Sequence, residues 1–233
     1  MIRLVAFDGD NTLWDFDAAM RSALRSTLED LWTNHPGPST AALTVERMIA
    51  IRDRVAAELE GRVADLAVVR YAAFERTLEE IGITDAALAA RLNAMFFAIK
   101  AQRLRAFEDV VPALDAVYGR YRIALLSNGN TDPAQLGLDR YFDSILYSAT
   151  EGVAKPDPGI FRVLLDRTGV PAEDSAYVGD SLRDDIAGAR RAGMHSIWLN
   201  RSGAPNTTGI VPDAEVRSLA EVPDVLEVWS GGS

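Results

Sequence analysis

Residues 7–14 read Phe-Asp-Gly-Asp-Asn-Thr-Leu-Trp and directly follow an apolar run that begins at Ile2. The apolar run predicts a buried strand, so Asp8 and Asp10 stand at its carboxyl end. Alternate residues of an extended chain share a face, and the two carboxylates are therefore expected to converge on one ion or one substrate group. Carboxylates this close together bind a cation, share a proton or have shifted pKa values. The stretch points to a metal-assisted active site.

The same stretch has two simpler interpretations. Asp, Asn and Gly all favour turns, so the segment alone is also compatible with an ordinary turn. A calcium-binding loop needs a glycine at its sixth position and a bidentate glutamate at its twelfth. Counted from Asp8, these positions hold Leu13 and Ala19, which excludes the calcium loop. The choice between a turn and an active site depends on the rest of the chain.

The composition is that of a globular enzyme. The chain has 233 residues, of which 48% are apolar and 25% charged, enough for one large or two modest domains. Its net charge of −10 argues against general binding to nucleic acid or to an anionic membrane. The absence of cysteine excludes a thiolate metal site and a Cys nucleophile. With no apolar run of about 18 residues and no signal-peptide pattern, a cytoplasmic location is expected.

Hydrophobic periodicity divides the chain into two regions. In residues 17–106, apolar residues recur at helical spacing in four stripes, which predict a small helical bundle. From residue 107 onward, short β-rich runs alternate with helical segments, which is typical of a parallel, doubly wound sheet. The expected strands cover residues 2–7, 122–126, 144–147, 175–178 and 196–199. We therefore expect an α/β core domain of residues 1–16 and 107–233, interrupted by an all-α domain of residues 17–106.

Polar clusters follow the expected strands, where ligands bind in sheets of this kind. The clusters are Asp8 with Asp10, Ser127-Asn128-Gly129, Lys155 before Pro156, and Asp180 with Asp184 and Asp185. Lysine is rare in the chain, since it occurs only at positions 100 and 155. Four such clusters in one order are far more specific than any one of them.

In this order the clusters resemble the motifs of the haloacid dehalogenase superfamily of phosphatases and related hydrolases. The matching stretches are Asp8-Gly-Asp-Asn-Thr12, Leu126-Ser-Asn-Gly129, Lys155-Pro-Asp-Pro158 and Gly179-Asp-Ser-Leu-Arg-Asp-Asp-Ile-Ala-Gly-Ala189. They span nearly the whole chain. The helical insertion resembles the cap domain that this family places after its first motif, so the resemblance implies a Rossmann-like core with an inserted helical cap.

The resemblance implies distinct roles for the acids. Asp8 is expected to be the nucleophile that forms a phosphoaspartate, which divides one hard step into two. Asp10 is expected to protonate the leaving oxygen and then to activate water. Asp8, the backbone carbonyl of Asp10 and the side chain of Asp180 are expected to hold Mg²⁺, an ion that prefers oxygen ligands. Asp184 and Asp185 both have acceptable spacing for a supporting acid, and the Ile-Ala-Gly-Ala that follows favours Asp185.

The other matching residues are expected to bind the phosphate or to support the site. Ser127 is expected to donate its hydroxyl to a phosphoryl oxygen, helped by backbone N–H groups near Asn128 and Gly129. Lys155 is expected to neutralise the phosphate and to order Asp8, a task that suits a compact cation. Thr12 is expected to support the turn through its hydroxyl without touching substrate.

Asp10 favours one reaction over the others. The resemblance implies that dehalogenases lack this acid and the metal, because a departing halide needs no proton. We therefore expect a Mg²⁺-dependent phosphatase acting on a small phosphorylated metabolite. A phosphomutase, a 2-haloacid dehalogenase-like hydrolase and a non-catalytic binding protein on the same fold are the alternatives.

Basic residues of the helical region are candidates for reading a second anionic group of the substrate. Arg70 lies beside the apolar stripe of its helix and is the first choice among them. The others are Arg52, Arg54, Arg62, Lys100 and Arg103. The sequence leaves the identity of the phosphate ester and the oligomeric state open.

Overall fold

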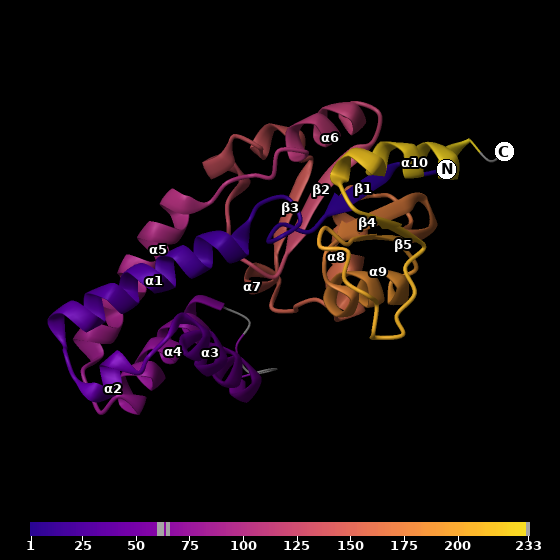
Figure 1. The fold of residues 1–233 in the computed structure, drawn as a ribbon. Helices are drawn as coiled ribbons and strands as arrows, with labels where there is room; N and C mark the ends of the chain where they lie inside the picture. The colour runs from indigo at the N-terminus through magenta and orange to yellow at the C-terminus, as the bar shows by residue number, and fades with distance from the viewer. Residues whose placement is uncertain (60–62, 64–65, 232–233) are drawn as a thin grey trace. The chain divides into compact units, whose positions relative to one another are not determined.

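The computed structural model describes residues 1–59, 63 and 66–231 (Figure 1). The chain separates into two compact units. The core unit comprises Met1–Asp15 and Ala106–Ser233, and the helical unit comprises Phe16–Arg105. Within the described residues, no helix combines the length and the apolar character needed to cross a membrane.

The core unit is built on a six-stranded sheet in which every neighbouring pair of strands is parallel. The strands are β1 (Leu4–Phe7), β2 (Arg122–Ser127), β3 (Ser144–Tyr147), β4 (Ser175–Gly179), β5 (His195–Leu199) and β6 (Ala214–Val216). The predicted α/β class with a parallel, doubly wound sheet is therefore confirmed. Strand β6 was not predicted, because three residues that include the polar Glu215 carry no periodic signal.

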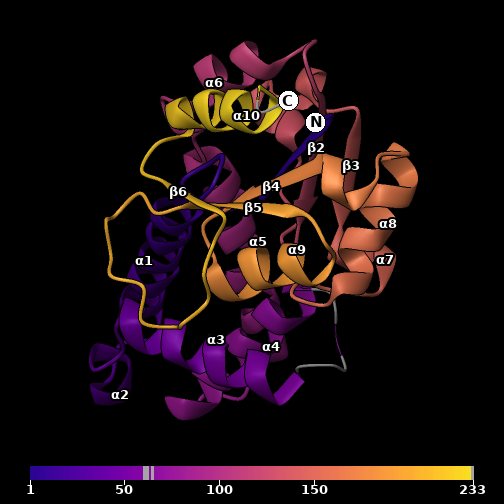
Figure 2. The same ribbon diagram turned by 90° about the vertical axis from the view of Figure 1, so that its right-hand side faces the viewer.

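Helices cover both faces of this sheet. They are α6 (Val110–Val117), α7 (Ser148–Glu151), α8 (Pro158–Thr168), α9 (Ala187–Arg191) and α10 (Val222–Ser230). Helices α6 and α10 lie on one face, and α8 and α9 lie on the other (Figure 2). On the second face, alternate strand residues such as Leu4, Ala6 and Tyr177 pack against Phe161 and Leu164 of α8. Burial of both faces explains why the strands read as apolar runs.

The strand order β3-β2-β1-β4-β5-β6 makes β1 the switch point of the sheet. Successive strands extend from β1 on one side through β2 and on the other through β4, and Phe7 aligns with Leu125 and Val178. At such a point the loops that follow the strands diverge and leave a crevice at the carboxyl edge. The first acidic motif begins there, directly after β1.

The helical unit contains five helices among its described residues. They are α1 (Phe16–Asn34), α2 (Pro38–Ala41), α3 (Val45–Leu59), α4 (Leu66–Glu80) and α5 (Ala86–Arg103). The four predicted stripes correspond to α1, α3, α4 and α5. Their apolar residues form a large buried cluster that includes Leu28, Phe74, Leu92 and Phe96, and a smaller one of Val55, Val69 and Ala73. The additional single turn α2 starts at Pro38, whose fixed φ suits the first helical position.

Candidate active site

The ammonium group of Lys155 is the centre of the site. Its Nζ donates to Asp8 Oδ1 at 2.6 Å, to Asp185 Oδ1 at 2.7 Å and to the Tyr177 hydroxyl at 2.9 Å. The Lys155 side chain is only 2% exposed. Since an ammonium has three N–H donors, all of them are used inside the protein. Lys155 therefore holds Asp8 by hydrogen bonding, and it can act on an incoming anion only through its charge.

The surrounding charges stabilise this ammonium in its protonated form. Burial lowers the pKa of Lys155, but the negative charges of Asp185 and Asp8 outweigh that effect and raise the pKa well above its usual value. The Tyr177 hydroxyl accepts from Lys155 and donates to the Leu126 carbonyl at 2.7 Å. Lys155 is therefore tied both to the acids and to the backbone of β2.

Three carboxylates converge beside Lys155. One oxygen from each of Asp8, Asp180 and Asp185 lies within 4.8 Å of the others. Within the described residues, these three side chains form the group of potential metal ligands. Burial raises the pKa of Asp180 to about 8, and the charges of Asp8 and Asp185 add to the effect. Burial also raises the pKa of Asp185, against the opposing charge of Lys155. Three acids thus face one ammonium, which leaves negative charge uncompensated.

This group has the chemistry of a Mg²⁺ site. Magnesium prefers oxygen ligands. In proteins it is usually bound by a small number of carboxylates and keeps several of its water ligands. A divalent cation would offset both the burial and the repulsion from Asp8 and Asp185 that raise the pKa of Asp180. Asp8, Asp180 and Asp185 are therefore the residues suited to hold it.

The choice between Asp184 and Asp185 depends on how the chain turns after β4. A single π-helical turn covers Leu182–Ile186, and Asp185 is 1% exposed. The Ser181 N–H donates to Asp185 Oδ2 at 2.9 Å, and a Cβ added at Gly179 would lie 2.3 Å from the same oxygen. Asp184 instead donates its backbone N–H to the Ser181 hydroxyl. Asp185 is thus the acid that reaches Lys155, in a place that only glycine at position 179 leaves open.

The loop after β2 brings Asp10 and Ser127 together. Ser127 is buried, and its Oγ accepts from the Gly129 N–H at 3.0 Å. A Cβ added at Gly129 would lie 2.5 Å from Asp10 Oδ2 and 3.3 Å from Ser127 Oγ. The absence of a side chain at position 129 therefore allows the Asp10 carboxylate to approach this loop closely.

Asn128 connects the loop after β2 to the loop that carries Lys155. Its Nδ2 donates to the Lys155 carbonyl, and its Oδ1 accepts from the Lys155 N–H, both at 2.9 Å. The Ser148 hydroxyl also donates to Asn128 Oδ1. The side chain of Asn128 therefore fixes the backbone of Lys155, while its own backbone remains the part predicted to face a phosphate.

The structure does not give Thr12 its expected role. The Thr12 side chain is fully buried, and within the described part of the chain its hydroxyl has no hydrogen-bond partner. The turn is held through the backbone instead, since the Leu13 N–H donates to the Gly9 carbonyl at 2.8 Å and Arg201 donates to the Thr12 carbonyl at 2.9 Å. Arg201 is anchored by two hydrogen bonds to Asp109 at 2.9 and 3.0 Å.

Arg70 is buried inside the helical unit. Its guanidinium carbon lies 4.6 Å from the centre of the Phe96 ring, and burial lowers its pKa to about 10. Its role as a substrate contact stays a prediction. Two of the other basic candidates form ion pairs, Arg52 with Asp53 and Arg54 with Glu80. Lys100 lies over the rings of Phe16 and Phe97. Arg62 lies outside the described residues.

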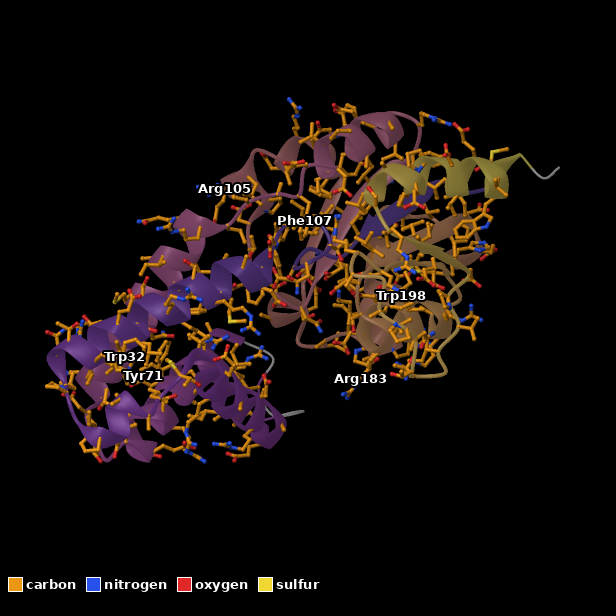
Figure 3. The ribbon with its side chains drawn as sticks, in the orientation of Figure 1. Trp32, Tyr71, Arg105, Phe107, Arg183 and Trp198 are labelled. Carbon is orange, nitrogen blue, oxygen red and sulfur yellow. The ribbon has the colours of Figure 1, made fainter. Side chains whose placement is uncertain are left out.

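Tyr177 and Trp14 belong to the site although no role was predicted for them. Tyr177 accepts from Lys155, and the Trp14 indole donates to Asp10. The sequence does not distinguish a tyrosine that takes part in the site from one that only fills the core, because both lie inside an apolar strand. Trp198 on β5, labelled in Figure 3, similarly donates its indole N–H to the Asp180 carbonyl at 2.9 Å.

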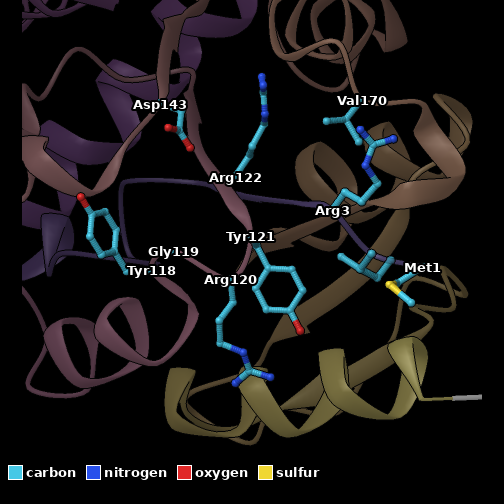
Figure 4. Close-up of a pocket in the computed structure, with 10 residues that line it drawn as sticks. Met1, Arg3, Tyr118, Gly119, Arg120, Tyr121, Arg122, Asp143 and Val170 are labelled. Carbon is cyan, nitrogen blue, oxygen red and sulfur yellow. The ribbon is translucent and has the colours of Figure 1, made fainter.

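A surface pocket of about 590 Å³ lies at the opposite edge of the sheet (Figure 4). It is lined by residues at the amino ends of β1 and β2, among them Arg3, Arg120 and Arg122. Arg3 and Arg120 pair with Asp174 and Glu227. No predicted site residue lines this pocket, so it is separate from the acidic site.

Comparison with known proteins agrees with this geometry. The family model of haloacid dehalogenase-like hydrolases matches residues 2–193. The chain belongs to this family of hydrolases. It is 28% identical to the N-acylneuraminate-9-phosphatase of Rattus norvegicus, over 97% of this chain and 94% of that protein.

Two solved structures illustrate the range of this hydrolase family. A 2-haloacid dehalogenase from Pseudomonas syringae pv. Tomato DC3000 is 34% identical, with a TM-score of 0.77 over 98% of this chain and 100% of that one. The putative hydrolase YfnB from Bacillus subtilis, bound to magnesium, is 25% identical, with a TM-score of 0.80 over 97% and 99% of the chains. The chain is therefore an enzyme of a family that includes both phosphatases and dehalogenases.

The close approach at Gly129 gives a first testable prediction for this hydrolase. Gly129→Ala should lower kcat by about 10–100-fold, because the new methyl group would displace the Asp10 carboxylate. Gly37→Ala is the matched control, since a Cβ there meets nothing within 4 Å and the φ of −179° is extended. Steady-state kinetics of both variants would measure the effect. Wild-type kcat in Gly129→Ala would contradict the expectation that turnover depends on the Asp10 carboxylate in this place.

Proposed function

We propose that this hydrolase is a Mg²⁺-dependent phosphatase that cleaves small phosphomonoesters through a phosphoaspartate on Asp8. One observation carries the proposal: the Asp10 carboxylate lies against the loop of Ser127 and Gly129. An alkoxide leaving from a phosphate ester needs a proton, whereas a halide does not. The loop of Ser127, Asn128 and Gly129 is the proposed phosphate-binding loop. An acid beside it is therefore expected in a phosphatase.

The attack begins from Asp8. Its Oδ1 is held by Lys155 at 2.6 Å, which leaves Oδ2 to attack phosphorus. The Ser127 Oγ accepts from the Gly129 N–H, so its own hydrogen is available for a phosphoryl oxygen. The buried charge of Lys155 offsets the approach of one anion to another.

Asp10 then serves both halves of the reaction. It donates a proton to the leaving oxygen as the bond to phosphorus breaks, and it afterwards takes a proton from the water that attacks the phosphoaspartate. Bound at Asp8, Asp180 and Asp185, Mg²⁺ would supply positive charge that shields the nucleophile from the phosphate. The oxygen donor set and the magnesium-bound relative support this assignment.

We further propose that the helical unit is the cap that selects the substrate. Relatives of this chain include an N-acylneuraminate-9-phosphatase and, at 32% identity, a phosphoserine phosphatase of Thermus thermophilus, which supports a small phosphorylated metabolite as the substrate class. Arg70 and the other cations of the helical unit are the candidates for contacts beyond the phosphate.

Dehalogenation is the second candidate, because a 2-haloacid dehalogenase is 34% identical to this chain. Purified protein should release phosphate from small phosphomonoesters with Mg²⁺ present, and chelation should abolish that release. It should release no halide from a 2-haloacid under the same conditions. Halide release without phosphate release would favour the dehalogenase, and a screen of phosphorylated sugars, nucleotides and short acids would identify the ester.

Cation binding should also be linked to proton release. Without a cation, Asp180 is largely protonated at pH 7 because its pKa is about 8, and it must lose that proton to bind Mg²⁺. We expect release of close to one proton per Mg²⁺ at pH 7 and much less at pH 9. Mg²⁺ affinity should rise by up to about tenfold per pH unit below pH 8.

Isothermal titration calorimetry in buffers of different ionisation enthalpy would measure this proton count. Asp180→Asn removes the titrating group, so the Mg²⁺ binding that remains in this variant, measured at higher Mg²⁺ concentration, should show no buffer dependence. An enthalpy that is independent of the buffer in the wild-type protein at pH 7 would contradict the prediction.

A further inference from the structure

Trp14 lies directly beneath the loop that carries the two acids. It is fully buried, and its indole Nε1–H donates a hydrogen bond to Asp10 Oδ1 at 2.6 Å. A Cβ added at Gly9 would lie 2.4 Å from Cζ2 of this indole. The ring therefore packs against the backbone between Asp8 and Asp10, in space that only glycine at position 9 leaves open.

We propose that Trp14 is the positioning residue of Asp10, which turns Oδ2 toward the phosphate-binding loop for proton transfer. The inference rests on the proposed phosphatase function and deepens it. Trp14 is fully buried and its N–H is used by Asp10, so it acts through Asp10 and not on the substrate. It acts by fixing the orientation of the Asp10 carboxyl group, so that the oxygen that carries the proton faces the reaction.

The two oxygens of Asp10 have different surroundings. Oδ1 accepts from the Trp14 indole, whereas Oδ2 is the oxygen that a Cβ at Gly129 would meet at 2.5 Å. An indole N–H can only donate, so it pairs with an oxygen that carries no proton. The proton that Asp10 exchanges with the leaving group is therefore carried on Oδ2, beside Ser127 and Gly129.

The backbone makes this arrangement rigid. The Asn11 N–H donates to the Trp14 carbonyl at 2.8 Å, and the Leu13 N–H donates to the Gly9 carbonyl at 2.8 Å. Rotation of the Asp10 carboxylate would leave the buried indole N–H without its partner, which is unfavourable. The hydrogen bond therefore favours one orientation of Asp10 while substrates and products exchange.

Substrates that differ in their leaving group can test this role. Trp14→Phe removes the N–H, and replacement of Trp14 by benzothienylalanine puts sulfur in its place with almost no change of shape. We expect kcat/KM for an alkyl phosphate to fall by about 10–100-fold in both variants, because its leaving group needs the proton. For p-nitrophenyl phosphate, whose leaving group departs without help, the loss should stay below about threefold.

Two further measurements complete the experiment. Trp32→Phe is the control, because the Trp32 indole donates to the Thr40 carbonyl within the helical unit and the residue is 43% exposed; both substrates should keep wild-type kinetics. The indole N–H resonance of Trp14, assigned by its loss in Trp14→Phe, should move upfield in Asp10→Asn. This signal reports on the contact without any turnover.

The outcomes separate this inference from the function on which it rests. Equal losses for the two substrates, or no loss in the benzothienylalanine protein, would overturn the positioning role. A Trp14 resonance that does not respond to Asp10→Asn would overturn it as well. Wild-type protein that cleaves neither phosphate ester would instead refute the phosphatase, and the resonance would still decide whether the contact exists.

Discussion

Asp8→Asn should reduce phosphomonoester turnover by at least about 10³-fold if, as we propose, the carboxylate is the group that attacks phosphorus. The substitution keeps the shape of the side chain and an oxygen that can accept from Lys155. Lys155 also keeps its contacts with Asp185 and Tyr177. The fold should therefore survive, and the loss should appear in kcat.

Covalent trapping would link this loss to the chemistry. Rapid acid quenching followed by intact-mass spectrometry should reveal a phosphate adduct in the wild-type protein and none in Asp8→Asn. A fluoride analogue of phosphate with Mg²⁺ should stabilise the wild-type protein against heat and leave the variant unaffected. More than a tenth of wild-type turnover in a correctly folded Asp8→Asn protein would refute Asp8 as the nucleophile.

Lys155→Met should impair both stability and turnover. The side chain is 2% exposed and is the cation among three acids, so its removal leaves Asp8 and Asp185 buried without their counter-charge. Breaking a buried ion pair on one side costs about 3–5 kcal/mol. For a chain of this size that corresponds to a fall in Tm of about 10 °C. We expect kcat to fall at least about 100-fold, since Asp8 also loses the group that orients it.

Two controls separate the stability effect from the catalytic effect. The double variant Lys155→Met with Asp185→Asn should recover part of the lost Tm, because one uncompensated charge is removed, but it should not recover turnover. Arg91→Met breaks the exposed pair with Asp30 and should cost less than about 1 kcal/mol. Differential scanning calorimetry and phosphate release would measure both quantities. A Lys155→Met protein as stable as the Arg91→Met protein would contradict the buried-charge argument.

The elements of the core were predictable because a parallel sheet covered on both faces is apolar along its whole length. Residues 4–7 are all buried, and the runs that became β2, β4 and β5 are almost entirely buried as well. In β3, which lies at one edge of the sheet, only Leu146 is buried. Strand β6 lies at the other edge of the sheet, where three residues suffice and one of them, Glu215, is exposed. Its position depends on pairing with β5 rather than on its own pattern.

The position of the candidate site was also predictable, for a topological reason. Polar residues after apolar strands must gather at one edge once the strands are parallel. Lys155 and Asp8 are 147 residues apart in the chain, yet their side chains are in contact. Chain order alone therefore predicts that Asp8, Ser127 and Asp180 lie at a common edge.

Pattern and spacing determined the class of the fold, the edge of the sheet that carries the chemistry and the residue types gathered there, because these follow from periodicity and chain order. The orientation of the side chains in the site was decided only by the folded chain. One residue along a helical turn rotates a side chain by about a quarter turn, so spacing could not separate Asp184 from Asp185. The contacts of Tyr177 with Lys155, of Trp14 with Asp10 and of Gly129 with Asp10 depend on packing between segments, which no local pattern encodes.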